Sequence, residues 1–181
     1  MSKVVKSNII NNYDILFGMP KALKIITIKD KDEEKLLRQV SKEIYPEEIN
    51  TPQFQEFLDN LLYTAQHSEE QGNVPAGGIA AVQVGEHKRV FFILNYDTNL
   101  WEVFINPKIE IEEFLKTTTK EGCLSVPDVL ADITRYLKIK IKYQNKEGKW
   151  ETKKYEGLNA VSIQHELDHL EGILFIDRME K

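Results

Sequence analysis

The pattern of apolar and polar positions predicts two main helices. After Thr51 and Pro52, apolar residues recur at helical spacing and form one stripe. The stripe consists of Phe54, Phe57, Leu58, Leu61, Leu62 and Ala65. Thr51 suits an N-cap and Pro52 a first helical position, so we expect this helix to begin there and to end near residues 67–71. A second helix is predicted from about Leu158 to Leu170, before Gly172 at a C-terminal cap position.

In the second half of the chain the apolar spacing changes from helical to alternating, which predicts strands. The run at residues 90–94 is short enough for a buried strand, and the polar turn after it predicts a hairpin. Leu, Ile and Tyr alternate with lysines at residues 137–143, which indicates one buried and one solvated face. The expected strands are residues 25–29, 90–94, 101–105, 137–143 and 150–156. Together these elements indicate an α+β fold with mostly antiparallel sheets packed around the C-terminal helix.

Composition and charge exclude some classes of protein. With 181 residues, 41% of them hydrophobic and 29% charged, the chain is expected to form one domain over residues 1–181, with residues 1–12 loosely ordered. A net charge of -5 argues against a large nucleic-acid footprint, and no apolar run reaches membrane-span length. Without a recognisable signal segment, a cytoplasmic location is expected. A single cysteine, Cys123, excludes an intramolecular disulfide.

The C-terminal helix carries a candidate metal motif. His165-Glu166-Leu167-Asp168-His169 fits H-E-x-x-H. On a helix, His165 and His169 lie on one face and can hold one metal ion, while Glu166 reaches water beside it. The alternative is a helix with two surface histidines. Because apolar residues surround much of this helix, however, buried histidines would need polar partners, and a metal supplies them.

A third ligand is expected upstream of the motif. Catalytic sites of the zinc type commonly have three protein ligands and one open position. Little chain follows the motif, and Phe175 stands where the metzincin pattern requires a histidine. Cys123, between Gly122 and Leu124, is the favoured candidate because its thiolate would complete a His-His-Cys site. His87 and His67 are weaker candidates.

Three stretches of the chain resemble the motifs of the peptide deformylase family. The family's G-x-G-x-A-A-x-Q corresponds to Ala-Gly-Gly-Ile-Ala-Ala-Val-Gln at residues 76–83. Its E-G-C-L-S corresponds to residues 121–125, and its H-E-x-x-H to residues 165–169. The order and spacing agree, and the likeness spans roughly residues 23–179.

The resemblance implies a set of catalytic roles. The metal ligands would be Cys123, His165 and His169. They would hold one divalent ion per chain, expected to be Fe(II), with Zn, Ni or Co able to replace it. Glu166 would act as general acid/base while a metal-bound water attacks the formyl carbon. Gln83 and the backbone N–H of Leu124 would stabilise the oxyanion.

The implied reaction removes the formyl group from the N-terminal formyl-methionine of newly synthesised polypeptides and releases formate. The implied partners are these nascent polypeptides, with a transient ribosome contact and with neither direct nucleic-acid binding nor a membrane. Gly78 and Gly122 are expected at the substrate. Leu158 and Val161 share the helix face of His165, so they are candidates for the wall that receives the methionine side chain, although such positions often belong to the core.

The chain departs from the family pattern at a few positions. Ala76 replaces the first glycine of the first motif, and Gly77 replaces an apolar residue that flanks the peptide substrate. Leu130 stands where many members have an arginine. These departures bear on peptide recognition and leave the reacting groups unchanged.

Alternatives remain at the level of single residues and of the whole protein. Glu121 either pairs with Arg135 to position the Cys123 loop, or the two form a surface ion pair worth under about 1 kcal/mol. Rival functions are an H-E-x-x-H endopeptidase, which would need a downstream ligand, and a non-catalytic protein that binds formylated or methionyl chain ends.

Overall fold

The computed structural model describes residues 19–111 and 113–179, so the expectation for residues 1–12 lies outside the described chain. The α-helices in these ranges are α2 (Lys31–Leu37), α3 (Pro46–Ile49), α4 (Pro52–Gln66) and α5 (Gly157–Leu170). The strands are β1 (Gly78–Ala80), β2 (Val90–Asn95), β3 (Leu100–Ile111), β4 (Lys116–Cys123), β5 (Val126–Tyr136), β6 (Lys138–Gln144) and β7 (Trp150–Glu156). The short 3₁₀ helices are η1 (Ser68–Gln71), η2 (Ala81–Val84) and η3 (Phe175–Arg178).

Both predicted main helices are confirmed, and their ends show why. The Thr51 side chain accepts a hydrogen bond from the Phe54 N–H, and Pro52 occupies the first turn of α4. At the end of α5, Gly172 adopts the left-handed conformation with φ 71°. Its N–H donates to the His169 carbonyl at 3.1 Å, which closes the last turn. None of the described helices has the length and apolar character that a membrane span requires.

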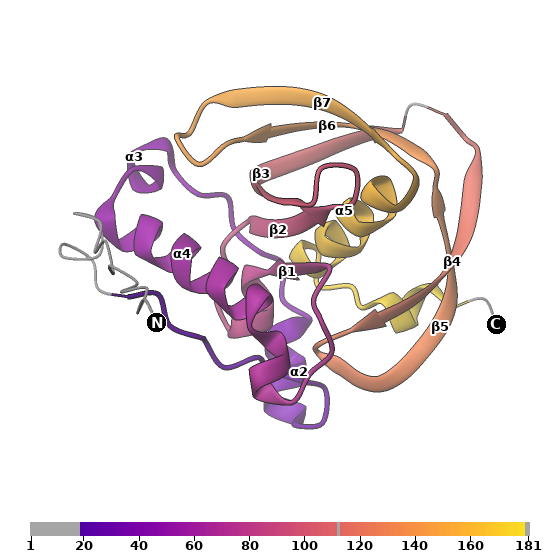
Figure 1. Ribbon diagram of the computed structural model, residues 1–181, viewed down its shortest axis with the longest axis horizontal. Helices are drawn as coiled ribbons and strands as arrows, with labels where there is room; N and C mark the ends of the chain where they lie inside the picture. The colour runs from indigo at the N-terminus through magenta and orange to yellow at the C-terminus, as the bar shows by residue number, and fades with distance from the viewer. Residues whose placement is uncertain (1–18, 112, 180–181) are drawn as a thin grey trace, which may run out of the picture.

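An antiparallel sheet in the order β1-β2-β3-β6-β7 separates the two main helices (Figure 1). The predicted hairpin is confirmed as β2–β3, with Phe91 opposite Phe104. Because strand side chains alternate, Phe91 and Ile93 pack with α5, whereas Val90 and Phe92 pack with α4. The strands predicted at residues 137–143 and 150–156 are β6 and β7. The α+β expectation is therefore confirmed.

A second, two-stranded sheet, β4–β5, lies beside α5 and was not predicted from the sequence (Figure 1). Its buried residues Ala131 and Ile133 form a separate apolar cluster with Leu37 of α2 and Phe175 of η3. This packing fixes the hairpin near α5, so the turn between Cys123 and Val126 lies next to the H-E-x-x-H helix.

The strand predicted at residues 25–29 is wrong. No strand forms there, and Ile28 and Lys29 lie in a turn; the N–H groups of the segment bond to η2 and to the β4–β5 turn. The Ile26 N–H donates to the Gln83 carbonyl at 2.9 Å, and the Ile28 N–H donates to the Ser125 carbonyl at 3.0 Å. The charged segment after it contains α2.

Candidate active site

The three predicted metal ligands lie together at the junction of β4 and α5. Cys123 is the last residue of β4, while His165 and His169 lie one turn apart on α5. The Cys123 Sγ is 3.2 Å from the His169 Nε2. One ligand atom from each of the three residues lies within 4.8 Å of the other two. This spacing allows all three to contact a single ion.

The donor set fits a divalent transition metal. A thiolate and two imidazoles suit Zn or Fe(II), whereas Mg and Ca prefer oxygen ligands. The Nδ1 of His165 is engaged with Glu121 at 2.8 Å, which leaves its Nε2 for a metal. Among the described residues, the buried His169 Nδ1 and Glu166 Oε2 have no hydrogen-bond partner. The unpaired Glu166 oxygen can accept a hydrogen bond from a water molecule in the cleft, as a hydrolytic site requires.

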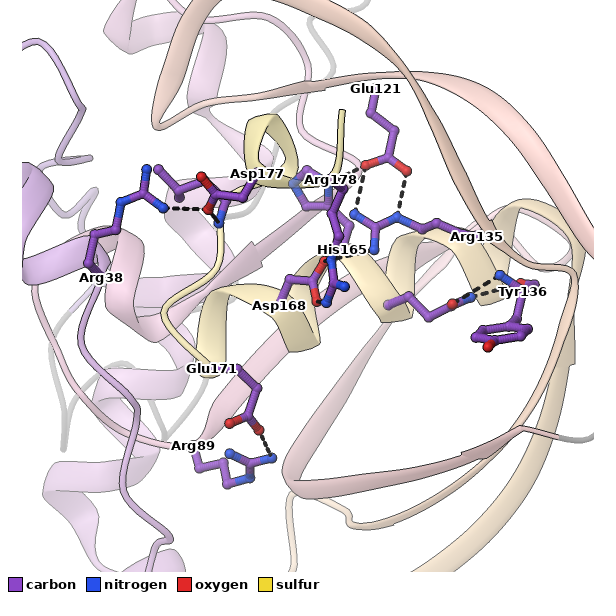
Figure 2. Close-up of polar contacts among 12 residues, drawn as sticks. Arg38, Arg89, Glu121, Arg135, Tyr136, His165, Asp168, Glu171, Asp177 and Arg178 are labelled. Carbon is purple, nitrogen blue, oxygen red and sulfur yellow. Dashed lines mark hydrogen bonds and ion pairs between the residues drawn. The ribbon is translucent and has the colours of Figure 1, made fainter. Parts of the chain in front are cut away.

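A buried ion-pair network orients the first histidine (Figure 2). The Arg135 guanidinium donates to both oxygens of Glu121, with Nε–Oε1 at 2.6 Å and Nη2–Oε2 at 2.9 Å. The same Oε2 faces the Nδ1 of His165. Glu121 and Arg135 expose only 7% and 5% of their surfaces. The pair predicted between them is therefore present, and its burial excludes the surface ion-pair alternative.

The network continues onto two residues that the sequence did not indicate. Arg135 also donates from Nη1 to Asp168 at 2.8 Å, and Asp168 accepts from Arg178 at 2.7 Å (Figure 2). Asp168 thus lies between two guanidinium groups, on the α5 turn that contains His165 and His169. Its only sequence signal was its place inside the motif.

Burial and charge set the protonation of these groups. Burial alone would raise the pKa of Glu121, but hydrogen bonds with His165 and Arg135 outweigh burial and hold that pKa below its usual range. Burial lowers the pKa of His165, whereas hydrogen bonds to Cys123 and Glu121 raise it, with a net result of about 10. Burial lowers the pKa of His169 well below its usual value. An imidazole that ligates a metal must be neutral, so metal binding at His165 would displace a proton.

Glu166 lies at the floor of the site with only 4% of its surface exposed. Burial raises the pKa of its carboxyl group to about 7, against the opposing charges of His165 and Arg135. Its carboxylate contacts Gly78, where any added Cβ would collide with it. Gly78 therefore leaves room for the carboxylate at the cleft.

Gln83 is fixed beside Cys123 by a short hydrogen-bond network. Its Oε1 accepts from the Ala80 N–H at 2.8 Å, which sets the amide orientation. Its Nε2 then points to the Ser125 Oγ at 3.2 Å and the Cys123 Sγ at 3.5 Å. Leu124 follows Cys123 in the β4–β5 turn, and both lie in the wall of the same cleft as Gln83.

A cleft of about 230 Å³ opens beside these groups. The four predicted substrate residues, Gly78, Gly122, Leu158 and Val161, all line it. Tyr96 lines it as well, although the sequence placed it only in a turn. All predicted site residues are therefore in one place. The remaining histidines are elsewhere: His67 Nδ1 contacts the Tyr63 carbonyl and His87 Nε2 the Leu36 carbonyl.

Comparisons with known proteins agree with this arrangement. The family model described as polypeptide deformylase matches residues 22–181. A peptide deformylase of Mesorhizobium japonicum is 38% identical over 149 residues, which cover 81% of this chain and 80% of that protein. A probable peptide deformylase from Synechococcus phage S-SSM7 has a solved structure with 37% identity and a TM-score of 0.73, covering 87% of this chain and 100% of that one. The Met-Ala-Ser-bound peptide deformylase from Acinetobacter baumannii has 28% identity and a TM-score of 0.77, covering 89% and 100% of the two chains. The chain therefore belongs to the polypeptide deformylase family of hydrolases.

Proposed function

We propose that this protein removes the formyl group from the N-terminal formyl-methionine of newly synthesised polypeptides and releases formate. The observation that carries the proposal is the position of Glu166 in the cleft, beside the cluster of Cys123, His165 and His169. The Acinetobacter relative has been solved with the methionyl peptide Met-Ala-Ser bound. The proposal includes a cytoplasmic location and a transient contact with the ribosome, from which such substrates emerge.

The proposed cofactor is one divalent ion per chain, held by Cys123, His165 and His169. We propose Fe(II), with Zn, Ni or Co able to replace it. When bound, such an ion lowers the pKa of water and polarises the formyl oxygen.

Glu166 is the proposed general acid/base. Its carboxylate takes a proton from water as the water oxygen bonds to the formyl carbon. It then delivers this proton to the methionine nitrogen as the carbon–nitrogen bond breaks, which yields a free amine and formic acid; the acid loses its proton to the amine and leaves as formate. The burial that raises the pKa of Glu166 to about 7 suits a group that both accepts and donates a proton.

Gln83 and Leu124 are the proposed donors to the formyl oxygen. Charge gathers on this oxygen as the carbon becomes tetrahedral, and fixed N–H groups stabilise it. The Gln83 amide is already oriented through the Ala80 N–H, so little reorganisation is needed. Leu124 would contribute its backbone N–H from the turn after Cys123.

The other cleft residues are proposed to hold the peptide. Val161 and Leu158 lie on the α5 face that lines the cleft, where they offer apolar surface to a methionine side chain. Gly78 and Gly122 carry no side chain, which lets a peptide backbone approach the wall. β1 forms one end of the five-stranded order, so a sheet edge lies beside the cleft.

Formate release from formyl-Met-Ala-Ser tests this proposal. The protein would be prepared with Fe(II) without oxygen, or loaded with Ni(II) or Co(II), alongside Glu166→Ala and the exposed control Glu147→Ala. We expect metal-dependent release that falls at least about a hundredfold in Glu166→Ala, with metal content retained and the control unchanged. Release that persists in Glu166→Ala contradicts the assigned base.

The same experiment separates the rival functions. One bound metal per chain with no formate release would favour a protein that only binds methionyl chain ends. Cleavage of internal peptide bonds in an unformylated peptide would favour an endopeptidase.

A further inference from the structure

The Tyr96 side chain fills the space that a side chain at residue 77 would occupy. A Cβ added to Gly77 would lie 2.5 Å from the Tyr96 Oη and 3.7 Å from its Cζ. Such a contact is shorter than packed atoms tolerate, so the tip of the phenol occupies the space that a side chain at residue 77 would need. The two residues therefore form one wall of the cleft together.

Tyr96 is held in this position from α5. Its backbone N–H donates to the Asn159 Oδ1 at 2.9 Å. Asn159 is itself buried on the first turn of α5, and its Nδ2 donates to the Asp97 Oδ2 at 2.9 Å. Tyr96 as a whole residue remains 48% exposed, and it lines the cleft, where its ring and hydroxyl can meet a ligand. An anchored backbone with an accessible aromatic side chain suits recognition, because little entropy is lost on binding.

The position of Tyr96 indicates which part of a peptide it meets. Gly78 lies against the Glu166 carboxylate, at the reacting end of the cleft. From there the cleft wall follows the chain backwards through Gly77 to Val74, which is 68% exposed. With a formyl group at Glu166, this wall offers the following residues a path past Gly77 and Tyr96 towards solvent.

From this arrangement, and resting on the proposed deformylase function, we infer that Tyr96 is a specificity-determining residue that contacts the peptide just after its formyl-methionine. It takes the place of the side chain missing at Gly77. Its ring offers a flat apolar surface to the peptide, and its hydroxyl can both donate to and accept from the peptide backbone.

The test compares wild type with Tyr96→Ala, Gly77→Val and the double variant. An exposed tyrosine outside the cleft, Tyr45, supplies the control Tyr45→Ala. The readouts are KM and kcat for formyl-Met-Ala-Ser and for formyl-Met, which has no following residues. Calorimetric binding of the unformylated peptide Met-Ala-Ser is measured in parallel.

Tyr96→Ala should raise KM for formyl-Met-Ala-Ser and weaken Met-Ala-Ser binding by about tenfold, with kcat within about twofold. It should leave KM for formyl-Met within about twofold. Gly77→Val alone should also impair binding, because the valine meets the phenol. The double variant should bind better than the sum of the single losses predicts, since Tyr96→Ala clears the space for the valine.

An unchanged KM and unchanged peptide binding in Tyr96→Ala overturn the inference, as do strictly additive effects in the double variant. Equal losses for formyl-Met and formyl-Met-Ala-Ser overturn it too, because they indicate a general structural effect. Failure of the proposed function looks different: wild type would bind Met-Ala-Ser in a Tyr96-dependent way but release no formate. Absence of Met-Ala-Ser binding by wild type counts against the inference itself.

Discussion

The same carboxylate oxygen of Glu121, Oε2, contacts both Arg135 and His165. The Arg135 Nη2 is 2.9 Å from this oxygen and the His165 Nδ1 is 2.8 Å from it. One buried arginine therefore fixes the carboxylate that in turn fixes the ring of a proposed metal ligand. Metal affinity should depend on these Arg135–Glu121–His165 contacts, because groups that hydrogen-bond to a ligand set its orientation and basicity.

Glu121→Gln should weaken metal binding by about 10–100-fold, because the amide keeps the shape but loses the charge that pairs with Arg135. It should also lower the free energy of unfolding by about 3–5 kcal/mol, since a buried arginine loses a charged partner. Chelator competition and urea denaturation measure the two effects. Asp32→Asn, in an exposed pair with Lys35, is the control and should change stability by under about 1 kcal/mol. Unchanged metal affinity in Glu121→Gln would contradict a role of Glu121 in orienting His165 for the metal.

Cys123→Ser should abolish stoichiometric metal binding and formate release, because a neutral hydroxyl is a poor replacement for a thiolate. Metal content after gel filtration, measured beside wild type, gives the answer directly. If the variant keeps one firmly bound metal per chain, Cys123 is no ligand and the third ligand lies elsewhere.

Gly78→Ala should reduce kcat/KM at least about tenfold while leaving metal content unchanged, because the new Cβ displaces the Glu166 carboxylate. Gly122→Ala is the comparison variant. Its Cβ would meet the Leu130 Cδ2 at 2.8 Å, the mobile end of an exposed side chain, so a smaller loss is expected. Steady-state kinetics and metal analysis compare the two variants. Equal losses of kcat/KM would argue against a specific clash between residue 78 and the Glu166 carboxylate.

Gly172→Ala should destabilise the protein by about 1–3 kcal/mol more than Gly85→Ala. Both glycines have positive φ, 71° and 82°, so both variants incur backbone strain of about 1–2 kcal/mol. Only at Gly172 would the new Cβ collide with backbone, namely the Arg38 carbonyl, whereas nothing lies within 4 Å at Gly85. Urea denaturation at equal metal saturation measures the difference. Similar midpoints for the two variants would show that the contact with Arg38 relaxes freely.

The sequence predicted the main helices and the sheet because their signals are local. Thr51 and Pro52 mark a helix start. β2 appears in the sequence as a continuous apolar run, and β6 appears as an alternation of apolar residues and lysines. The β4–β5 hairpin gave no such signal. The one buried residue of β4 is the charged Glu121, and β5 contains Pro127, which argues against a central strand. A strand whose inward position serves the site does not follow the usual hydrophobic pattern.

The candidate site could be predicted as far as its residues fall in short motifs. Cys123 and the two histidines were found in this way, and the structure brings them together. Asp168 and Tyr96 were missed as partners because their contacts are long-range: Arg135 is 33 residues from Asp168. Turn residues such as Tyr96 carry no periodicity that shows which surface they cover.

The segment at residues 26–28, before α2, connects two parts of the site by hydrogen bonds. Its N–H groups at Ile26 and Ile28 bind the carbonyls of Gln83 and Ser125. Two residues of chain span at most about 7 Å, so the segment limits the spacing between η2, which carries Gln83, and the turn of Leu124. The alignment of the two proposed oxyanion donors therefore depends on a segment that carries no reacting group. Changes in this segment can alter catalytic rate from outside every recognisable motif.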